Sequence, residues 1–396
     1  MTKDDTNQAL CHLIARRIAG SPNGRITFAE YMELALYDPE HGYYATNVAN
    51  IGMHGDFFTS PHLGADFGEL LGDLFVEMWQ TLGEPAKFTL VEMGAGQGVL
   101  AADLLTYVRR RHPGFFEALE YTIVEKSAAL VVEQRQRLGS FAEQAGKLHW
   151  STLAEIEPDS VRGCFFANEL VDAFPVHQFV IAEGKLQEIY VTARSTENGT
   201  VFQEVSGEPS TPIAEFFELV GLEPRTLGEG YRSEVNLLAL DWLEAVAQRL
   251  AHGYLLTIDY GHTTSQYYHP TRAKGTLQCY YQHTVHDDPY AHVGRQDLTA
   301  HVNFTALERQ AERCGLSNLG LTRQSLLLVA QGIAERIAAL GTGSRPEQFM
   351  ETLRRRDALH RLIDPQGLGN FGVLVQGKGL ETALALKVLS MTASAP

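Results

Sequence analysis

The sequence predicts an α/β fold built around a mostly parallel β-sheet. Short apolar runs of strand length alternate with amphipathic runs of helix length through residues 86–193, which is the pattern of successive βαβ units. A turn with three glycines, "GAGQG" at residues 94–98, joins the first strand to its helix, and Glu125 ends the second strand. Glycine turns and acidic residues at these positions border the ligand crevice of open parallel sheets.

The composition is that of a globular protein and excludes several classes. The chain has 396 residues, of which 44% are hydrophobic and 20% charged, enough apolar material for a large core. Its net charge of −16 is opposite to that of a nucleic-acid-binding surface, so we expect no nucleic-acid partner. The four cysteines are far apart and the histidines match no standard ligand spacing, so we expect no metal.

The N-terminus predicts a cytoplasmic location. The first residues, "MTKDDTNQAL", include two aspartates and no apolar segment, unlike a signal peptide or an Arg-rich presequence. Apolar runs also stay shorter than a membrane span. We therefore expect a cytoplasmic protein without a membrane span, and nothing in the sequence indicates an oligomeric state.

Residues 1–85 predict a helical region and a loop that covers a ligand. Thr27 and Glu30 have the spacing of a capping box, which predicts a helix that begins after Thr27. The run "FGELLGDLFVEMWQTLG" has helical periodicity. The loop between these helices is rich in glycine and aromatic residues, and it is too apolar for a linker.

Residues 86–193 contain the predicted α/β core. We expect strands at "FTLVEMG", "LEYTIVEKS" and "GCFFANEL", helices at "VLAADLLTYVRRR" and "AALVVEQRQRL", and a pair of strands at "HQFVIAEGKLQEIYVTA". Each strand is a short apolar run, and each helix has apolar residues at helical spacing. Two βαβ units therefore lead from residue 88 to the third strand.

The rest of the chain predicts an insertion and the second half of the core. Residues 194–250 are polar around the apolar island "IAEFFELVGL" and then form the amphipathic run "SEVNLLALDWLEAVAQRL", which indicates an insertion or lid and a helix. Residues 251–380 supply the strand "GYLLTIDYGH", a long substrate-side loop at 263–297, the helix "FTALERQAERCG", two more helices and a last strand, "FGVLVQG". Residues 381–396 form a tail.

The glycine turn is compatible with several ligands. Gly94, Gly96 and Gly98 form G-x-G-x-G, and Glu92 precedes them. A phosphate-binding P-loop would need a terminal Gly-Lys-Ser/Thr, and a dinucleotide turn would need G-x-G-x-x-G. The pattern acid-x-G-x-G-x-G resembles the first motif of S-adenosylmethionine (SAM) methyltransferases, in which the acid helps to hold the cationic end of the cofactor. The alternative is a glycine-rich turn without a ligand.

Glu125 favours a nucleoside-type cofactor. A carboxylate at the tip of the second strand can accept two hydrogen bonds from a ribose diol. The alternative is that Glu125 caps the following helix, where the helix dipole favours an acid. The turn and the acid together predict a cofactor that contains a nucleoside.

Polar residues also follow two further strands, where they would face the crevice. Asn168, Glu169 and Asp172 come after the third strand and could orient a nucleophilic nitrogen; alternatively, Asn168 and Glu169 begin a helix and Asp172 belongs to a turn. A second group of residues lies at the end of the strand near residue 258. We predict that these residues line the substrate side; alternatively, they belong to the core or to a turn. This group consists of Asp259, Tyr260 and His262.

Several longer motifs resemble the MidA-like SAM-dependent methyltransferases, from about residue 25 to about residue 375. In chain order they are "FAEYMELALYDPEHGYYA", "GDFFTSPHLGADFGELLG", "VEMGAGQGVLAADLL", "IVEKSAALVVEQ", "FFANELVDAFPVHQF", "IDYGH", "GTLQCYYQH" and "VGRQDLTAHVNF". The resemblance implies a class I methyltransferase (Rossmann-like) core, with a helical N-terminal part and insertions, and SAM as cofactor. Its better-known mitochondrial members are protein-arginine methyltransferases that act on a subunit of respiratory complex I.

The resemblance also implies roles for individual residues. Glu169 would hold an arginine guanidinium, with Asn168 as its hydrogen-bonding partner. The segment "GDFFTSPH" would cover the cofactor from the N-terminal side, and His62 stands where the family often has glutamate. The covering residues are Gly55, Asp56, Phe58, Thr59 and Ser60.

We therefore expect a SAM-dependent protein arginine methyltransferase, with a protein substrate such as a respiratory-complex subunit. One alternative is a small-molecule N- or O-methyltransferase, which a large pocket lined by the insertion would favour. The other is a SAM-binding assembly protein without catalysis, which a buried, salt-bridged Glu169 would favour.

Overall fold

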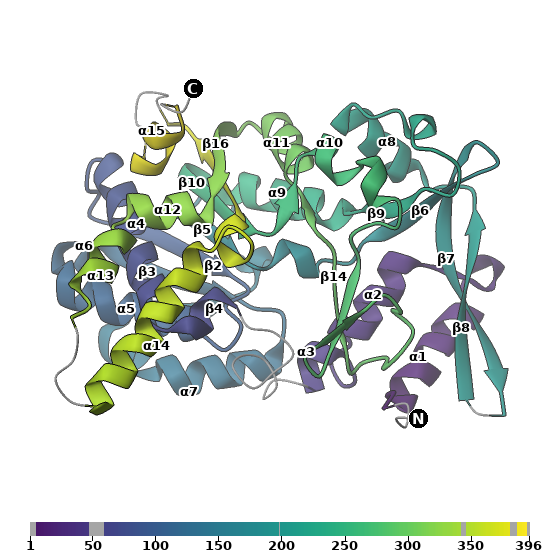
Figure 1. Cartoon of the computed structure of the whole chain (residues 1–396), viewed down its shortest axis with the longest axis horizontal. Helices are drawn as coiled ribbons and strands as arrows, with labels where there is room; N and C mark the ends of the chain where they lie inside the picture. The colour runs from purple at the N-terminus through teal and green to yellow at the C-terminus, as the bar shows by residue number, and fades with distance from the viewer. Residues whose placement is uncertain (1–4, 47–58, 198, 342–345, 381–385, 394–396) are drawn as a thin grey trace.

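The computed structural model describes residues 5–46, 59–197, 199–341, 346–380 and 386–393. In Figure 1 a region with a large sheet covered by helices lies in the left half, and a region with a second, antiparallel sheet lies in the right half.

A seven-stranded sheet is the centre of the first region. Its strands are β2 (Phe88–Met93), β3 (Leu119–Val124), β4 (Leu148–Ser151), β5 (Val161–Asn168), β10 (Leu250–Asp259), β16 (Ser317–Arg323) and β17 (Gly372–Lys378). They are ordered β16-β17-β10-β5-β2-β3-β4. All neighbours are parallel except that β17 runs antiparallel to β10 and β16. From β2 the chain builds outward to β3 and β4, and from β5 it builds in the opposite direction, so the topological switch point lies between β2 and β5.

Helices cover both faces of this sheet. Leu90 on β2 and Phe166 on β5 pack on one face, whereas their neighbours Val91 and Phe165 pack on the other, as the alternation of side chains along a strand requires. The first face is covered by α4 (Asp66–Thr81), α5 (Val99–Arg111), α6 (Pro113–Ala118) and α7 (Ala128–Ala145). The second is covered by α9 (Leu237–Arg249) and α11 (Phe304–Arg313). The predicted α/β class with a mostly parallel sheet is confirmed.

The second sheet combines N-terminal and central segments of the chain. Its five strands are β1 (Ile26–Thr27), β6 (His177–Ala182), β7 (Lys185–Thr196), β8 (Gly199–Gly207) and β9 (Arg232–Val235). The predicted strand pair is the antiparallel hairpin β6–β7. The neighbouring helices are α1 (Gln8–Ala19), α2 (Phe28–Tyr37) and α8 (Thr211–Val220). The Thr27 side chain accepts a hydrogen bond from the Glu30 amide at 3.1 Å, which confirms the predicted start of α2.

The segment predicted as a long loop contains regular structure. Strands β12 (Gln278–Tyr281), β13 (Thr284–His286) and β14 (Asp297–Thr299) form a three-stranded antiparallel sheet. Around it lie α10 (Thr264–Tyr267) and a short parallel pair, β11 (Gly261–His262) with β15 (Val302–Asn303). These strands are too short to produce a readable alternation of apolar residues. Together with α3 (Tyr43–Thr46) they bring the second region toward the edge of the large sheet.

In the described part of the chain, three α-helices lie between β16 and β17, where the sequence predicted two. They are α12 (Gln324–Ala330), α13 (Ile333–Ala339) and α14 (Pro346–Ile363), and α15 (Lys387–Ala393) follows β17. Gln331 and Gly332 end α12 and separate it from α13, a break that the apolar periodicity does not reveal.

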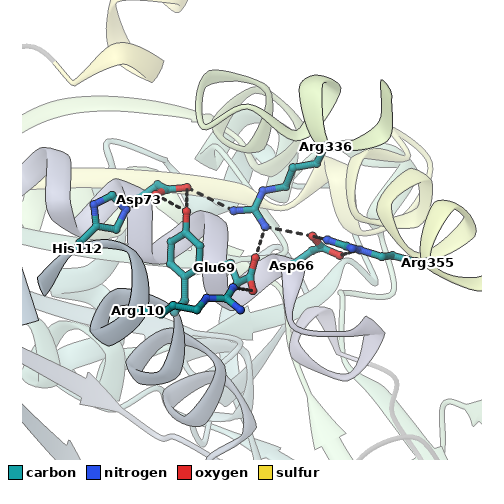
Figure 2. A network of polar contacts seen from close by, with 8 residues as sticks. Asp66, Glu69, Asp73, Arg110, His112, Arg336 and Arg355 are labelled. Carbon is teal, nitrogen blue, oxygen red and sulfur yellow. Dashed lines mark hydrogen bonds and ion pairs between the residues drawn. The ribbon is translucent and has the colours of Figure 1, made fainter. Parts of the chain in front are cut away.

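An ion-pair network fixes α13 and α14 to α4 (Figure 2). Arg336 of α13 donates to Asp66 at 3.1 Å and also pairs with Glu69. Arg355 of α14 binds both oxygens of Asp66, each at 2.7 Å. The helix α14 also packs against two short 3-10 turns, η3 (Ser60–Leu63) and η8 (Leu368–Asn370). The network therefore holds the segments that carry these turns, and both turns border the cavity described next.

Candidate functional site

A cavity of about 600 Å³ opens at the carboxyl ends of β2, β3 and β5. It includes the switch point between β2 and β5, which is where open α/β sheets bind ligands. One wall comes from the loops after these strands. The other comes from α2, α3, β12 and β14, and η3 and η8 lie at the border.

The glycine turn forms part of the first wall. Gly94, Gly96 and Gly98 have φ angles of +71°, +53° and +74°, a region that residues with a Cβ rarely adopt. A Cβ on Gly94 would meet Leu170 Cδ1 at 2.7 Å, so Gly94 is needed for packing. Among the described residues other than its chain neighbours, a Cβ on Gly96 would meet no atom within 4 Å, and Gly96 lines the cavity. The backbone at Gly96 is thus open to a ligand.

Two acids flank this turn. Glu92 is only 3% exposed, accepts a hydrogen bond from the Tyr121 hydroxyl at 2.8 Å, and lines the cavity. Burial raises its pKa to about 7. Glu125 also lines the cavity, accepts from the Ser127 amide at 2.9 Å, and has a pKa raised by burial. The contact with Ser127 at the start of α7 agrees with the capping alternative, and the cavity position agrees with ribose binding, so the two roles are compatible.

Gln134 joins the turn to Glu125, a role that was not predicted from the sequence. Its amide nitrogen donates to the Gly96 carbonyl at 2.7 Å and to Glu125 Oε2 at 3.2 Å. Its amide oxygen accepts from Trp150 Nε1 at 3.0 Å, and the side chain is fully buried. A signal was present: Gln134 lies midway between the buried Leu130 and Leu138 in helical spacing, so a polar residue occupies a core position of α7.

We expect Gln134→Leu to weaken binding of S-adenosylhomocysteine (SAH) by roughly 1–3 kcal/mol, the usual cost of leaving buried polar groups without a partner. Leucine fills a similar volume but leaves the Gly96 carbonyl and Glu125 unsupported. Titration calorimetry measures the effect, and Gln136→Leu is the matched control because Gln136 is exposed on the same helix. Equal affinities of the two variants would show that Gln134 does not organise the site.

Asn168 and Glu169 lie where β5 ends. Glu169 has φ +51°, an unusual conformation for a residue with a side chain. Its Oε1 accepts from Asn168 Nδ2 and from the Ser60 amide, both at 3.2 Å. Burial raises the pKa of Glu169 to about 8, and the charge of Asp172 adds to the rise. The next element is the single 3-10 turn η5 (Val171–Ala173) and not an α-helix, which argues against the helix-start alternative.

The three residues predicted for the substrate side, Asp259, Tyr260 and His262, do not all line the cavity. Tyr260 and Asp172 line the cavity, and the Tyr260 hydroxyl donates to Asp172 Oδ2. Asp259 does not line it: this carboxylate is fully buried and accepts from the amides of Val171, Asp172 and Tyr260 at 2.9–3.2 Å. Asp259 therefore lies beneath η5 and fixes that turn, which differs from the predicted place on the wall.

His262 likewise is not among the residues that line the cavity. Its ring packs against His301 with ring centroids 5.1 Å apart, and His301 is the member of this pair that lines the cavity. Burial lowers the pKa of both rings to about 4, so both are neutral near pH 7.

The covering segment is described only in part. Thr59 lines the cavity, and its hydroxyl lies 2.6 Å from His62 Nδ1. Ser60 is buried and contacts Glu169 through its amide. The other predicted covering residues, Gly55, Asp56 and Phe58, lie outside the described residues.

Most residues of the second wall were not predicted. They come from α2 and α3, from the segment 263–297, which was predicted as a substrate-side loop without a role for any single residue, and from the residues just after that segment. These residues are Tyr37, Tyr44, Gln278, Tyr280, Asp297, Thr299 and His301.

The cavity is acidic. Among the described residues that line it, none is lysine or arginine, and the carboxylates are Glu92, Glu125, Glu169, Asp172 and Asp297. Such a lining favours cationic groups. SAM carries a sulfonium and an amino group. The open backbone at Gly96 and the acid at Glu125 suit its amino-acid and ribose parts, so the described residues fit SAM.

The sheet order, the glycine turn after β2 and the acid after β3 together define a class I SAM-dependent methyltransferase. The comparisons with known proteins agree. The family described as "Putative S-adenosyl-L-methionine-dependent methyltransferase" matches residues 70–322, and the chain belongs to this MidA-like family.

Curated relatives and a solved structure match most of the chain. A Drosophila melanogaster protein named "Protein arginine methyltransferase NDUFAF7 homolog, mitochondrial" is 30% identical, with 87% of this chain and 80% of the relative covered. The human protein arginine methyltransferase NDUFAF7, also named mitochondrial, is 28% identical, with 90% and 82% covered. A structure described as a "likely methyl transferase from Burkholderia thailandensis bound to S-adenosyl-homocysteine" has a TM-score of 0.82 and 31% identity, and 96% and 94% of the two chains are covered.

These names correct one prediction. The curated relatives are named mitochondrial, which contradicts the cytoplasmic location inferred from the N-terminus. Within the described ranges, no helix has the length and apolarity needed to cross a membrane. In the same part of the chain, no group of three or more His, Cys, Asp or Glu residues is arranged to hold a metal ion.

Proposed function

We propose that this SAM-dependent methyltransferase transfers methyl groups to arginine side chains of proteins. The observation that carries the proposal is the position of Glu169 at the end of β5, inside a cavity lined by acids and by no lysine or arginine among the described residues. The curated relatives are named protein arginine methyltransferases, which supports the same acceptor.

The cofactor half of the cavity would be formed by the residues after β2 and β3. The backbone at Gly94 and Gly96, which line the cavity, would face the amino-acid part of the cofactor, and Glu92 would stabilise its cationic end. Gly98 does not line the cavity and packs against Leu138 and Gln134 of α7. Glu125, held by Gln134, would accept hydrogen bonds from the ribose hydroxyls. When bound, SAM supplies a methyl group that its sulfonium has already activated.

Glu169 would orient the acceptor. Both of its described hydrogen bonds fall on Oε1, from Asn168 and from the Ser60 amide, so Oε2 remains to bind a guanidinium. A carboxylate held in this way fixes one guanidinium nitrogen toward the methyl group and stabilises the cation until its proton leaves. The role of Asn168 is then to position Glu169.

The pH dependence of methyl transfer should report Glu169. Burial raises its pKa from the usual 4.5 to about 8, so at lower pH the carboxyl is neutral and cannot pair with a guanidinium. We expect kcat/KM for the acceptor to rise with pH through an apparent pKa between these values, because the nearby sulfonium favours the ionised form. A rate profile that is flat from pH 5 to 9 would contradict this role.

Two structural features weigh against the alternatives. No described residue of 194–250 lines the cavity, whereas a small-molecule methyltransferase with a pocket built from the insertion would require such residues. Glu169 takes part in no described salt bridge, whereas a purely structural role predicts one. The first feature favours a larger substrate, and the second favours catalysis.

The test is quantitative mass spectrometry of arginine methylation in cells that lack the protein. Add-back of the native chain should restore methylation of specific arginines, and add-back of Glu169→Gln should not. Subunits of respiratory complexes are the first candidates, from the family resemblance. Restoration by Glu169→Gln would favour an assembly role, and a change confined to small metabolites would favour a small-molecule acceptor.

A further inference from the structure

A buried glutamine lies behind the residues that hold Glu169. Gln324 is the first residue of α12, and its side chain is fully buried. It is not among the described residues that line the cavity, and nothing in the proposed function uses it. A buried polar side chain is stable in a protein when its polar atoms are hydrogen-bonded, so the partners of this amide show what it does.

The hydrogen bonds of Gln324 reach three separate segments of the chain. Its Nε2 donates to the Leu362 carbonyl near the end of α14 at 3.1 Å, and its Oε1 accepts from the Ser60 hydroxyl of η3 at 3.3 Å. Its backbone amide donates to the Phe371 carbonyl, just after η8, at 2.9 Å. Gln324 therefore joins η3 to α14 and η8.

The partners of the side-chain amide fix its orientation. A backbone carbonyl can only accept a hydrogen bond, so the amide nitrogen must face Leu362, and the amide oxygen is left for Ser60. The Ser60 hydroxyl then donates its single hydrogen to Gln324. Ser60 is itself fully buried, and a buried hydroxyl that lost this partner would be unfavourable. The contact therefore anchors the Ser60 side chain.

Ser60 links this anchor to the carboxylate that is proposed to orient the acceptor. Its backbone amide donates to Glu169 Oε1 at 3.2 Å. The hydroxyl and the amide belong to one residue, so an anchor on the hydroxyl limits how far the amide can move. Hydrogen bonds weaken steeply as their distance and angle depart from the preferred values. The position of Ser60 therefore determines how well Glu169 is held.

The Ser60 amide also favours the charged form of Glu169. Burial and the charge of Asp172 raise the pKa of Glu169, whereas the hydrogen bonds from Ser60 and Asn168 lower it. The carboxyl of Asp259 also lies within range of the Glu169 charge. Because these acidic neighbours stay in place, loss of the Ser60 hydrogen bond should raise the pKa of Glu169 further.

We propose that Gln324 is a positioning residue for methyl transfer: it anchors Ser60, and through Ser60 it holds the Glu169 carboxylate in the orientation that binds the acceptor. The inference rests on the proposed function, in which Glu169 orients the acceptor, and it extends that function to a residue outside the cavity. It also relates the C-terminal helices to the reaction, because the same glutamine ties η3 to α14 and η8.

The experiment records the pH profile of methyl transfer by Gln324→Leu. Leucine fills a similar volume but removes both hydrogen bonds of the side chain. Glu169 should then ionise only at higher pH, so the rise of kcat/KM should move up by about one pH unit, the scale of one hydrogen bond to a charged group. Below this rise kcat/KM should fall by about tenfold, with recovery toward the native value at the alkaline end of the profile.

The pH dependence separates positioning from a general structural effect. A variant that is only less stable would lose the same factor in kcat/KM at every pH. The assay is the initial rate of tritiated-methyl transfer from SAM to a protein extract from cells that lack the protein. The extract is kept dilute, so that the rate is proportional to kcat/KM for the acceptor.

Gln331→Leu is the matched control. Gln331 follows the last residue of α12, is 9% exposed, and donates to Glu77 of α4 at 2.8 Å. It is not among the described residues that line the cavity. This substitution removes a buried amide at the other end of the same helix and leaves Ser60 in place, so its pH profile should match that of the native protein. SAH affinity, measured in parallel, shows that each variant is folded.

The outcomes separate the two proposals. A Gln324→Leu profile with the native midpoint overturns the positioning role alone. A native protein that transfers no methyl group, or whose profile is flat, overturns the role of Glu169 and the positioning role together. If Gln324→Leu does not bind SAH, Ser60→Ala decides the matter, since it removes the anchored hydroxyl and keeps the amide: a profile moved to higher pH supports the anchor, and a native profile overturns it.

Discussion

Glu169→Gln is expected to lower methyl transfer by at least about 10²-fold while the affinity for SAH stays near that of the native protein. Glutamine keeps the shape of the side chain, but it removes the negative charge that orients and stabilises the guanidinium, and losses of this size are typical of preorganised electrostatic contacts. The assay is transfer of tritiated methyl groups from SAM to a protein extract, with calorimetry of SAH on the same preparations.

Glu183→Gln is the control for this substitution. Glu183 also has a positive φ, +54°, but it is exposed in the β6–β7 hairpin, away from the cavity. Native activity in Glu183→Gln and its loss in Glu169→Gln would assign the effect to the site rather than to backbone strain. A Glu169→Gln protein that transfers methyl groups at the native rate would remove Glu169 from the mechanism.

Gly96→Val should abolish detectable binding of SAM and SAH. Its Cβ would enter open cavity space where we place the cofactor, and a side chain there excludes the ligand rather than weakening one contact. Calorimetry with both ligands measures the loss.

Strain is the competing explanation for Gly96→Val, because valine is unfavourable at φ +53°. Gly146→Val separates strain from blockage. Gly146 has φ +60° and is exposed at the end of α7, and a Cβ added there would also meet no atom within 4 Å in the described part of the chain apart from its neighbours in sequence. If both valine variants are folded and both bind SAH normally, the cofactor lies elsewhere.

The sequence predicted the parts of the fold that depend on local pattern. Strands β2 and β5 are apolar runs buried on both faces, whereas β3 alternates buried and partly exposed residues. The helices that follow β2 and β3 have clear periodicity, so the order of these elements along the chain already indicated βαβ units. It did not reveal β4 and β16, whose residues are more polar and lie at the edges of the sheet. Residues 233–235 were assigned to a helix, but they pair with β6, and Asn236 caps the helix that follows.

The same distinction applies to the candidate site. The residues just after β2, β3 and β5 could be identified because the carboxyl ends of parallel strands meet at one edge. Asp297 and Tyr44 are 253 positions apart in the chain and meet only through tertiary packing, so no spacing rule places them together. Asp259 shows the opposite limit, since a residue at the end of one strand can point beneath the turn that follows the neighbouring strand instead of toward the ligand.

The central claim is that the cavity methylates protein arginine, and identification of the labelled product tests it most directly. Purified native protein is incubated with methyl-labelled SAM and a protein extract from cells that lack it, and the proteins are hydrolysed to amino acids. The account predicts that the label is recovered in N-methylated arginine and is absent when Glu169→Gln replaces the native protein. Label recovered in another amino acid or only in small molecules, or no transfer at all, would contradict it.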